Sequence, residues 1–381
     1  MTQSTIIVAG DLCLRGRAQS LSSSELQPLL QDVKPILKSV DASLVNMETA
    51  VLRSAMASIP KSGPVIAADK RILDFICEGG FSGVTLANNH FADYGSDGVN
   101  DSLQLLDGYN LWHVGAGLNA DKAAEIKYLQ LDKNKVAIIN ACEHEFTIAT
   151  DNQAGCNALN PIHQYRAIQE AKLKADFVLV IIHGGVEHYS LPTPRMQETY
   201  RFFIDAGADA VVNHHQHCYS GYEIYQGKPI VYGLGNFFFD WPGMDSNWNK
   251  GYMVKLTFGQ EMGLELIPYF QNADALGIQL MEGIDKEQFY SKIEELNTII
   301  VNPSRLHTSL ASWVETKRED YLQFLLPKIG KNIKRMARLR LIPDSQRESW
   351  TPEYMTEQRK LLLRSLFQCE SHQDVLNTIL Q

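Results

Sequence analysis

The side chains best suited to chemistry are histidines and acids that follow apolar, β-branched runs. In NHHQH, residues 213–217, three imidazoles come directly after the run DAVV. If this loop is extended, His215 and His217 project to the same side, because alternate residues of an extended chain do so. Both would then reach one metal centre, with His214 beside them as an accessory group. The alternative is a polar loop whose histidines are incidental.

Three further runs end in side chains of the same kind. His183 follows DFVLVII, Asp11 follows TIIVAG, and Glu48 follows ASLVNM. Each has an ordinary alternative, such as a buried core histidine or an aspartate that caps a helix. The coincidence of several such strand ends favours a ligand cluster.

The segment ANNHFADYG, residues 87–95, supplies Asn88, Asn89, His90 and Asp93. Together the strand ends offer carboxylates, amides and imidazoles, a mixture that suits Mn, Fe or Zn and is too rich in histidine for Ca or Mg. One or two such ions activate water as hydroxide and polarise a phosphoryl or acyl oxygen. The chain has no Gly-rich phosphate loop after its first strand and no GxSxG elbow, so nucleotide-fold and serine-hydrolase mechanisms lose support.

Strands and helices alternate over the first 240 residues, which predicts an α/β fold. Periodicity alone indicates one parallel-rich sheet with helices on both faces, and ligands of such sheets gather at the carboxyl ends of the strands. The expected strands are 5–11, 42–48, 82–89, 135–141, 176–184, 209–215 and 229–236. The expected helices are 23–39, 69–79, 97–107, 162–174 and 194–206.

Beyond residue 250 the pattern changes to a closing hairpin, KGYMVKLTFG and GLELIPYFQN, followed by charged helical sequence. We therefore predict a catalytic domain over 1–271 and a helical C-terminal region over 284–381. The chain of 381 residues is 45% hydrophobic and 21% charged, which excludes disordered and collagen-like classes. A net charge of −9 argues against nucleic acid as a partner. With no apolar run of membrane-spanning length and no signal-peptide pattern, we expect a cytoplasmic protein.

The ordered blocks GDLCLRGR, LVNMETAV, VTLANNHFADYG, HGGVEHY and VVNHHQH…VYGLGNFFFD resemble the CapA/PgsA capsule-synthesis family. The resemblance covers about residues 5–240. It implies a calcineurin-like metallophosphoesterase fold, a four-layer α/β/β/α sandwich in place of the single sheet.

The resemblance also implies roles for the site residues. Metal ligands would be Asp11, Glu48, Asn89, His183, His215 and His217. His183 and His215 would bind one metal ion and His217 the other, with Glu48 as the bridging group. His90 would be the catalytic proton donor, and Asn88, Asp93 and His214 would lie around the metals.

This sequence departs from the family pattern in two places. Cys13 stands where phosphoesterases have a histidine, so one metal loses a ligand, and a buried core thiol is the ordinary interpretation. In HGGVEH the family's Trp and Tyr are missing, but Glu187 remains and is expected to orient His183. Arg15 or Arg17 would hold an anionic group of the substrate.

A basic stretch, KIGKNIKRMARLR at 328–340, contrasts with the acidic chain. It predicts an amphipathic helix that either docks on the domain or contacts an anionic membrane surface or polymer.

The resulting hypothesis is a metal-dependent hydrolase or transferase of capsule or exopolymer biosynthesis, acting on an anionic polymer or a phosphorylated substrate with a metal-bound hydroxide. Poly-γ-glutamate and polysaccharide both stay open as the polymer. The alternative is a non-catalytic accessory component of a polymer-synthesis complex that keeps the fold and one metal.

Overall fold

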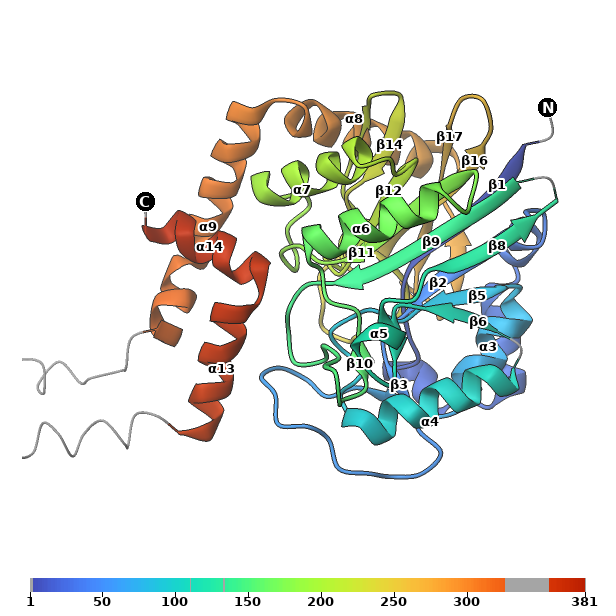
Figure 1. Ribbon diagram of the computed structural model, residues 1–381, viewed down its shortest axis with the longest axis horizontal. Coiled ribbons are helices and arrows are strands. Elements are labelled where there is room, and N and C mark those ends of the chain that lie inside the picture. Colours follow the sequence, from blue (N-terminus) through green and yellow to red (C-terminus); the bar gives the residue numbers. More distant parts are fainter. Residues whose placement is uncertain (1–2, 110, 133, 326–355, 381) are drawn as a thin grey trace, which may run out of the picture.

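The computed structural model describes residues 3–109, 111–132, 134–325 and 356–380. The predicted basic helix at 328–340 lies outside these residues. Within them, two mixed β-sheets stack face to face, and helices cover both outer faces (Figure 1). The four-layer α/β/β/α architecture implied by the family resemblance is therefore confirmed.

The first sheet has eight strands in the order β18-β17-β16-β1-β2-β5-β6, and β15 also pairs with β1. Its strands are β1 (Ser4–Cys13), β2 (Ala42–Met47), β5 (Gly83–Thr85), β6 (Trp112–Val114), β15 (Asn236–Phe239), β16 (Lys250–Phe258), β17 (Gly263–Gln271) and β18 (Ile278–Leu280). The predicted hairpin is confirmed as the antiparallel pair β16 and β17, which extends this sheet beyond β1.

The second sheet has six strands in the order β13-β14-β12-β11-β9-β8. They are β8 (Lys127–Leu131), β9 (Asn134–Cys142), β11 (Phe177–His183), β12 (Ala210–His214), β13 (Tyr222–Tyr225) and β14 (Lys228–Val231). Two short ribbons pair β3 (Ala50–Val51) with β4 (Ala67–Ala68) and β7 (Ala116–Gly117) with β10 (Gly155–Cys156).

The single sheet expected from periodicity is wrong. The strands do bury both faces, but one face packs against the other sheet and the opposite face packs against helices. On β1, Ile6 and Val8 pack between the sheets, whereas Ile7 packs against the outer helices. A strand between a sheet and a helix layer has the same apolar pattern as a strand between two helix layers. Hydropathy alone therefore could not assign the strands to two sheets.

The helices that cover the first sheet are α1 (Ser23–Leu26), α2 (Lys34–Leu37), α3 (Arg71–Gly79) and α4 (Gly95–Gly108), with short 3₁₀ turns η1 (Gly16–Ser20) and η2 (Gln27–Leu30). The helix expected over 23–39 is broken into these short pieces. Pro28 and Pro35 each stand near the start of a new piece, where a missing N–H costs no hydrogen bond. The short helix α5 (Ala120–Ala123) follows β7.

The second sheet is covered by α6 (Pro161–Lys172), α7 (Pro194–Asp205), α8 (Gly283–Ile300), α9 (Pro303–Leu325), α13 (Glu357–Gln368) and α14 (Glu370–Leu380). Figure 1 shows α9, α13 and α14, in orange and red, beside the end of the sheet where β9 and β11 terminate. Leu310, Val314 and Leu376 from these helices share one apolar core with Val180 and Ile182 of β11. Among the described residues, none of the helices combines the length and apolarity that a bilayer span requires.

Candidate metal centre

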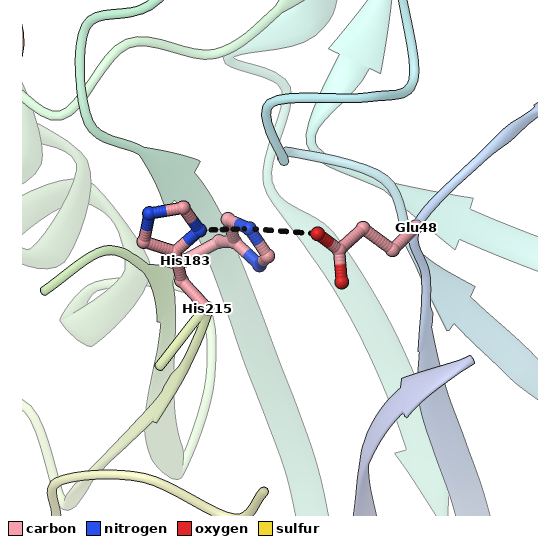
Figure 2. A group of neighbouring side chains, drawn as sticks. All are labelled: Glu48, His183 and His215. Carbon is pink, nitrogen blue, oxygen red and sulfur yellow. Dashed lines mark hydrogen bonds and ion pairs between the residues drawn. The ribbon is translucent and has the colours of Figure 1, made fainter. Parts of the chain in front are cut away.

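Ligand-type side chains from both sheets meet at the carboxyl ends of β1, β2, β11 and β12. Two groups of three, Glu48 with His183 and His215 and Asp11 with Glu48 and His217, each bring their ligand atoms within 4.8 Å of one another. Figure 2 shows the Glu48 carboxylate facing the imidazoles of His183 and His215. Glu48 belongs to both groups, as a residue bridging two metal ions would.

Glu48 is the least satisfied side chain in the cluster. It is completely buried, and neither carboxylate oxygen has a hydrogen-bond partner in the described part of the chain. Burial, followed by the nearby Asp11 carboxylate, raises the pKa of Glu48 well above its usual range. An unpaired buried carboxylate is costly unless a cation compensates it. The donor set therefore fits a divalent metal, and its mixture of nitrogen and oxygen atoms suits a transition metal.

The His183 imidazole lies at the centre of the first group. Its Nε2 is 2.9 Å from Nδ1 of His215, 3.1 Å from Oδ1 of Asn89 and 3.7 Å from Oε1 of Glu48. Burial, followed by the neighbouring imidazoles, lowers the pKa of His183 well below its usual value. A neutral imidazole is the form that binds metals.

The second group pairs Asp11 with His217. His217 Nδ1 is 3.6 Å from Oδ2 of Asp11, and its Nε2 is 3.7 Å from Oε1 of Glu48. The same Nδ1 is 2.9 Å from Oδ1 of Asn236, the first residue of β15. Asn46, on β2, donates from Nδ2 to Oδ1 of Asp11 at 2.7 Å and lies 3.2 Å from Nδ1 of His183. These two asparagines hold the ligand side chains in place.

The loop after β12 has a backbone conformation that the sequence did not predict. His215 and His217 are not extended: their φ angles are +93° and +57°. Positive φ at a residue other than glycine costs about 1–3 kcal/mol and is concentrated at functional sites. The left-handed backbone at both positions, and not strand alternation, brings the two imidazoles to the same centre.

His214 does not join the metal groups. Its Nε2 is 2.9 Å from the carbonyl oxygen of Ala9 on β1, so the imidazole links the two sheets. The imidazole that was expected to lie around the metals thus makes a hydrogen bond to the backbone of β1.

His90 lies at the edge of the cluster and lines the pocket above it. Its Nδ1 is 2.8 Å from Oδ2 of Asp93, and Asp93 also accepts a hydrogen bond from Lys61 Nζ at 2.7 Å. Burial, followed by the Lys61 ammonium, lowers the pKa of His90 to about 4. Asn88 fixes the loop, because its Oδ1 accepts hydrogen bonds from the backbone N–H groups of His90 and Phe91.

Two of the expected roles near the substrate are not found. The Glu187 side chain is exposed and lines the pocket, whereas the side chains within hydrogen-bond distance of His183 are Asn46, Asn89 and His215. Glu187 is thus not the residue that orients His183 in this structure. Arg17 forms a bidentate pair with Asp240 and is used by the fold.

Arg15 and Cys13 lie near the pocket without entering the metal groups. The Arg15 guanidinium stacks over Trp241, 4.0 Å from the ring centroid. Cys13 is completely buried in a small apolar cluster with Phe239 and Trp248, and burial raises its pKa far above the usual value. The core interpretation of Cys13 agrees with these surroundings, since a buried neutral thiol is a poor ligand.

A pocket of about 520 Å³ opens above the cluster. Sequence reasoning missed four polar side chains of the site: Lys61 and Glu145, which line the pocket, and Asn46 and Asn236, which contact the ligand side chains. Glu145 Oε1 is 3.8 Å from Nε2 of His215, and burial raises the pKa of Glu145 to about 8. Lys61 and Glu145 are brought in by loops, so no spacing in the sequence indicated them. Signals were available for the two asparagines, because Asn46 stands two residues before Glu48 and Asn236 ends the expected strand 229–236.

The chain was compared with known proteins. It is 31% identical over 245 residues to the capsule biosynthesis protein CapA of Bacillus anthracis, an alignment that covers 62% of this chain and 60% of that one. It is 32% identical over 215 residues to the PGA biosynthesis protein CapA of Bacillus subtilis, covering 56% and 57%. The chain thus spans somewhat less than two thirds of the length of these relatives.

Among solved structures, a putative 5′-nucleotidase from Staphylococcus aureus in complex with alpha-ketoglutarate is similar, with a TM-score of 0.47 and 16% identity over 77% of this chain and 58% of the other. The family model described as bacterial capsule synthesis protein PGA_cap matches residues 5–241. These residues carry every member of the two metal groups. The chain therefore belongs to the PGA_cap family of bacterial capsule synthesis proteins.

Proposed function

We propose that this protein is a metal-dependent hydrolase or transferase that acts in the assembly of a capsule or exopolymer. The observation that carries the proposal is the completely buried Glu48 carboxylate, which lies between two sets of ligand atoms without a hydrogen-bond partner among the described residues. Family membership and the names of the two Bacillus relatives support the pathway. Phosphoester and γ-glutamyl amide bonds both suit a centre of this kind.

The residues that would hold the metals are the members of the two groups together with Asn89. A divalent ion bound there lowers the pKa of a coordinated water and polarises a phosphoryl or acyl oxygen. The asparagines at 46 and 236 fix the imidazoles, and the apolar surroundings of the ligands strengthen every electrostatic interaction in the site.

His90 is the residue placed to move a proton. Asp93 engages Nδ1, which leaves Nε2 for a group in the pocket. With a pKa of about 4 the ring is neutral at pH 7, so it must gain a proton before it can serve as an acid. An anionic substrate beside the ring would raise that pKa, since opposite charge favours the protonated form. His90 would then protonate the leaving group.

Turnover of a small panel tests the proposal. Protein loaded with Mn²⁺ or Zn²⁺ is assayed with p-nitrophenyl phosphate, bis(p-nitrophenyl) phosphate and γ-glutamyl p-nitroanilide, and compared with Glu48→Gln. We expect at least one substrate to be cleaved by the parent protein, with loss of activity in Glu48→Gln and on chelation. A matched control, Glu265→Gln on the exposed part of β17, should keep full activity. Equal rates in both variants would contradict the proposal.

A second candidate is a non-catalytic accessory component, favoured by one observation. The position of the histidine expected on the first strand is filled by Cys13, which faces an apolar cluster. A protein of this kind would bind metal without cleaving any member of the panel.

A further inference from the structure

The pocket above the metal groups has two walls that come from different parts of the chain. One wall includes Phe239 and Trp241, which lie in the family-matched region, and Trp248, which follows shortly after it. The other is formed by α9 and by the α13–α14 pair, through Trp313, Lys317, Tyr321 and His372. Residues of the second wall lie outside the match to the family model, which ends at 241. The C-terminal helices therefore add to the pocket a wall that the family model does not cover.

The second wall is held firmly against the strand ends. Arg195 of α7 donates to Oε1 of Glu143 at 2.7 Å and to Oδ2 of Asp374 on α14 at 2.9 Å. The other oxygen of Glu143 accepts a hydrogen bond from the Ser371 hydroxyl at 2.6 Å. Glu143 directly follows β9 and stands two residues before Glu145. It therefore connects the start of α14 to the strand ends that carry the metal groups.

Both walls are aromatic. Trp248 lies 4.8 Å from the His217 ring and 6.0 Å from Trp241 by centroid distance, so this surface begins at the metal group and continues outward. On the other wall, Trp313 packs on Tyr189 at 5.2 Å and carries the Lys317 ammonium 5.8 Å above its ring. Aromatic side chains on both walls of one pocket suit a ring with an apolar face, and the pocket volume is in the range for a small ligand.

Polar side chains between the aromatic walls suit the hydroxyl groups of a ring-bearing substrate. Glu145 and Glu187 both line the pocket, while Lys61 is already paired with Asp93. Lys317, the other lysine that lines the pocket, makes no ion pair with any described carboxylate. The carboxyl oxygens of these two side chains can accept hydrogen bonds from the hydroxyl groups of a sugar ring.

Resting on the proposed function, we propose that the substrate is a sugar phosphate. Its phosphate lies at the metal groups and its ring lies between the Trp241–Trp248 surface and Trp313. The C-terminal helices are then a specificity element, and Trp313 is a positioning residue that contacts the ring and not the reacting atoms.

Calorimetric titration of the Mn²⁺-loaded full chain tests this with two ligands that a hydrolase does not cleave, the methylene phosphonate analogues of glucose 1-phosphate and of glycerol 3-phosphate. We expect the ring-bearing analogue to bind about tenfold more tightly, the effect of one good aromatic contact. Trp313→Ala should remove this preference while leaving the affinity for the glycerol analogue within about twofold. Trp313→Phe should keep most of it, and also provides a folded comparison if the alanine variant is unstable. Phe367→Ala, an exposed aromatic on α13, is the matched control and should behave as the parent protein.

Equal affinity for the two analogues, or no binding of either, would overturn the proposal. So would an unchanged preference in Trp313→Ala, or tighter binding of tri-γ-glutamate than of the ring-bearing analogue. The ratio of two affinities does not depend on turnover. Protein that holds metal and cleaves p-nitrophenyl phosphate without a ring preference would refute this inference alone, whereas absence of metal and of turnover would refute the proposed function.

Discussion

Glu48 shows why individual residues decide the chemistry of this fold. In water a carboxylate is solvated, but here both of its oxygens are buried without partners. A bound cation is the simplest compensation. Replacing Glu48 by Gln should abolish the rise in Tm that Mn²⁺ gives to the parent protein, a stabilisation of about 4 kcal/mol at a thousandfold excess over Kd. Thermal melts with and without Mn²⁺ measure it, and an undiminished rise would show that Glu48 is not a ligand.

The role of His90 can be separated from metal binding. His90→Ala should retain the metal content of the parent protein and lose about 10²–10⁴-fold in kcat, the usual size of a general-acid contribution. The matched control is His163→Ala on the exposed face of α6. Metal loss in His90→Ala would make this histidine a ligand, and an unchanged kcat would make it a loop residue that is held by Asp93.

At this scale the sequence predicted residue types better than their geometry. Asp11, Glu48, His183, His215 and His217 were identified because they follow apolar runs, and the structure brings them together. The supporting side chains were not identified, because Lys61 and Asn236 approach through contacts distant in sequence. The positive φ angles of His215 and His217 could not be predicted either, because neither residue is a glycine.

At the scale of elements, the helical C-terminal region is joined to the strand ends by ionisable groups. His144, two residues after β9, lies 2.6 Å by Nδ1 from Oε1 of Glu370 on α14, and this contact raises the pKa of His144. A pKa raised by folding contributes stability that is present below the unfolded value of about 6.5 and is lost as pH rises through the folded value. The contact should therefore stabilise α14 in mildly acidic solution.

Glu370→Gln tests the pH dependence. The fall in Tm relative to the parent protein should be larger at pH 5.5 than at pH 8.5, since only protonated His144 gains from the carboxylate. Glu357→Gln, which removes an exposed pair with Lys360 on α13, should show no such difference. An equal fall at both values would assign the contact to a neutral hydrogen bond.

The positions of helices and strands were the features that the sequence predicted best. The assignment of these elements to layers was the feature that it predicted least well. The strand expected at 82–89 ends at Thr85, because the following residues turn to present Asn88, Asn89 and His90. The four-layer arrangement followed only from the family resemblance, since burial on both faces does not distinguish one sheet from two.

At the scale of the whole molecule, the division of the chain at 271 and 284 remains a prediction from composition. One apolar core nevertheless includes Val180 of β11 together with Leu310 of α9 and Leu376 of α14. Elements that share a core unfold together. Calorimetry should give a single transition for the second sheet and the C-terminal helices, and a separate early transition would show that the helices form their own unit.

The basic segment 328–340 adds a prediction that concerns partners. Its attraction to an anionic bilayer should be about 1 kcal/mol per basic residue near the surface and should fade with salt. Co-sedimentation with phosphatidylserine vesicles at low and high ionic strength measures it, with Lys331, Lys334 and Arg338 changed to Glu as the comparison. Equal partitioning with phosphatidylserine vesicles and with neutral vesicles would contradict this prediction and favour a helix that docks on the domain.

The central claim is that the buried carboxylates and imidazoles form a metal centre, and the metal content of the purified full chain tests it most directly. Elemental analysis of protein prepared without chelator, and again after reloading with Mn²⁺, Fe²⁺ or Zn²⁺, should give one to two equivalents of a transition metal per chain. His217→Ala should lower that stoichiometry, whereas His163→Ala should not. A parent protein that retains no metal after reloading, or a His217→Ala variant with undiminished content, would contradict the assignment of this cluster as a metal site.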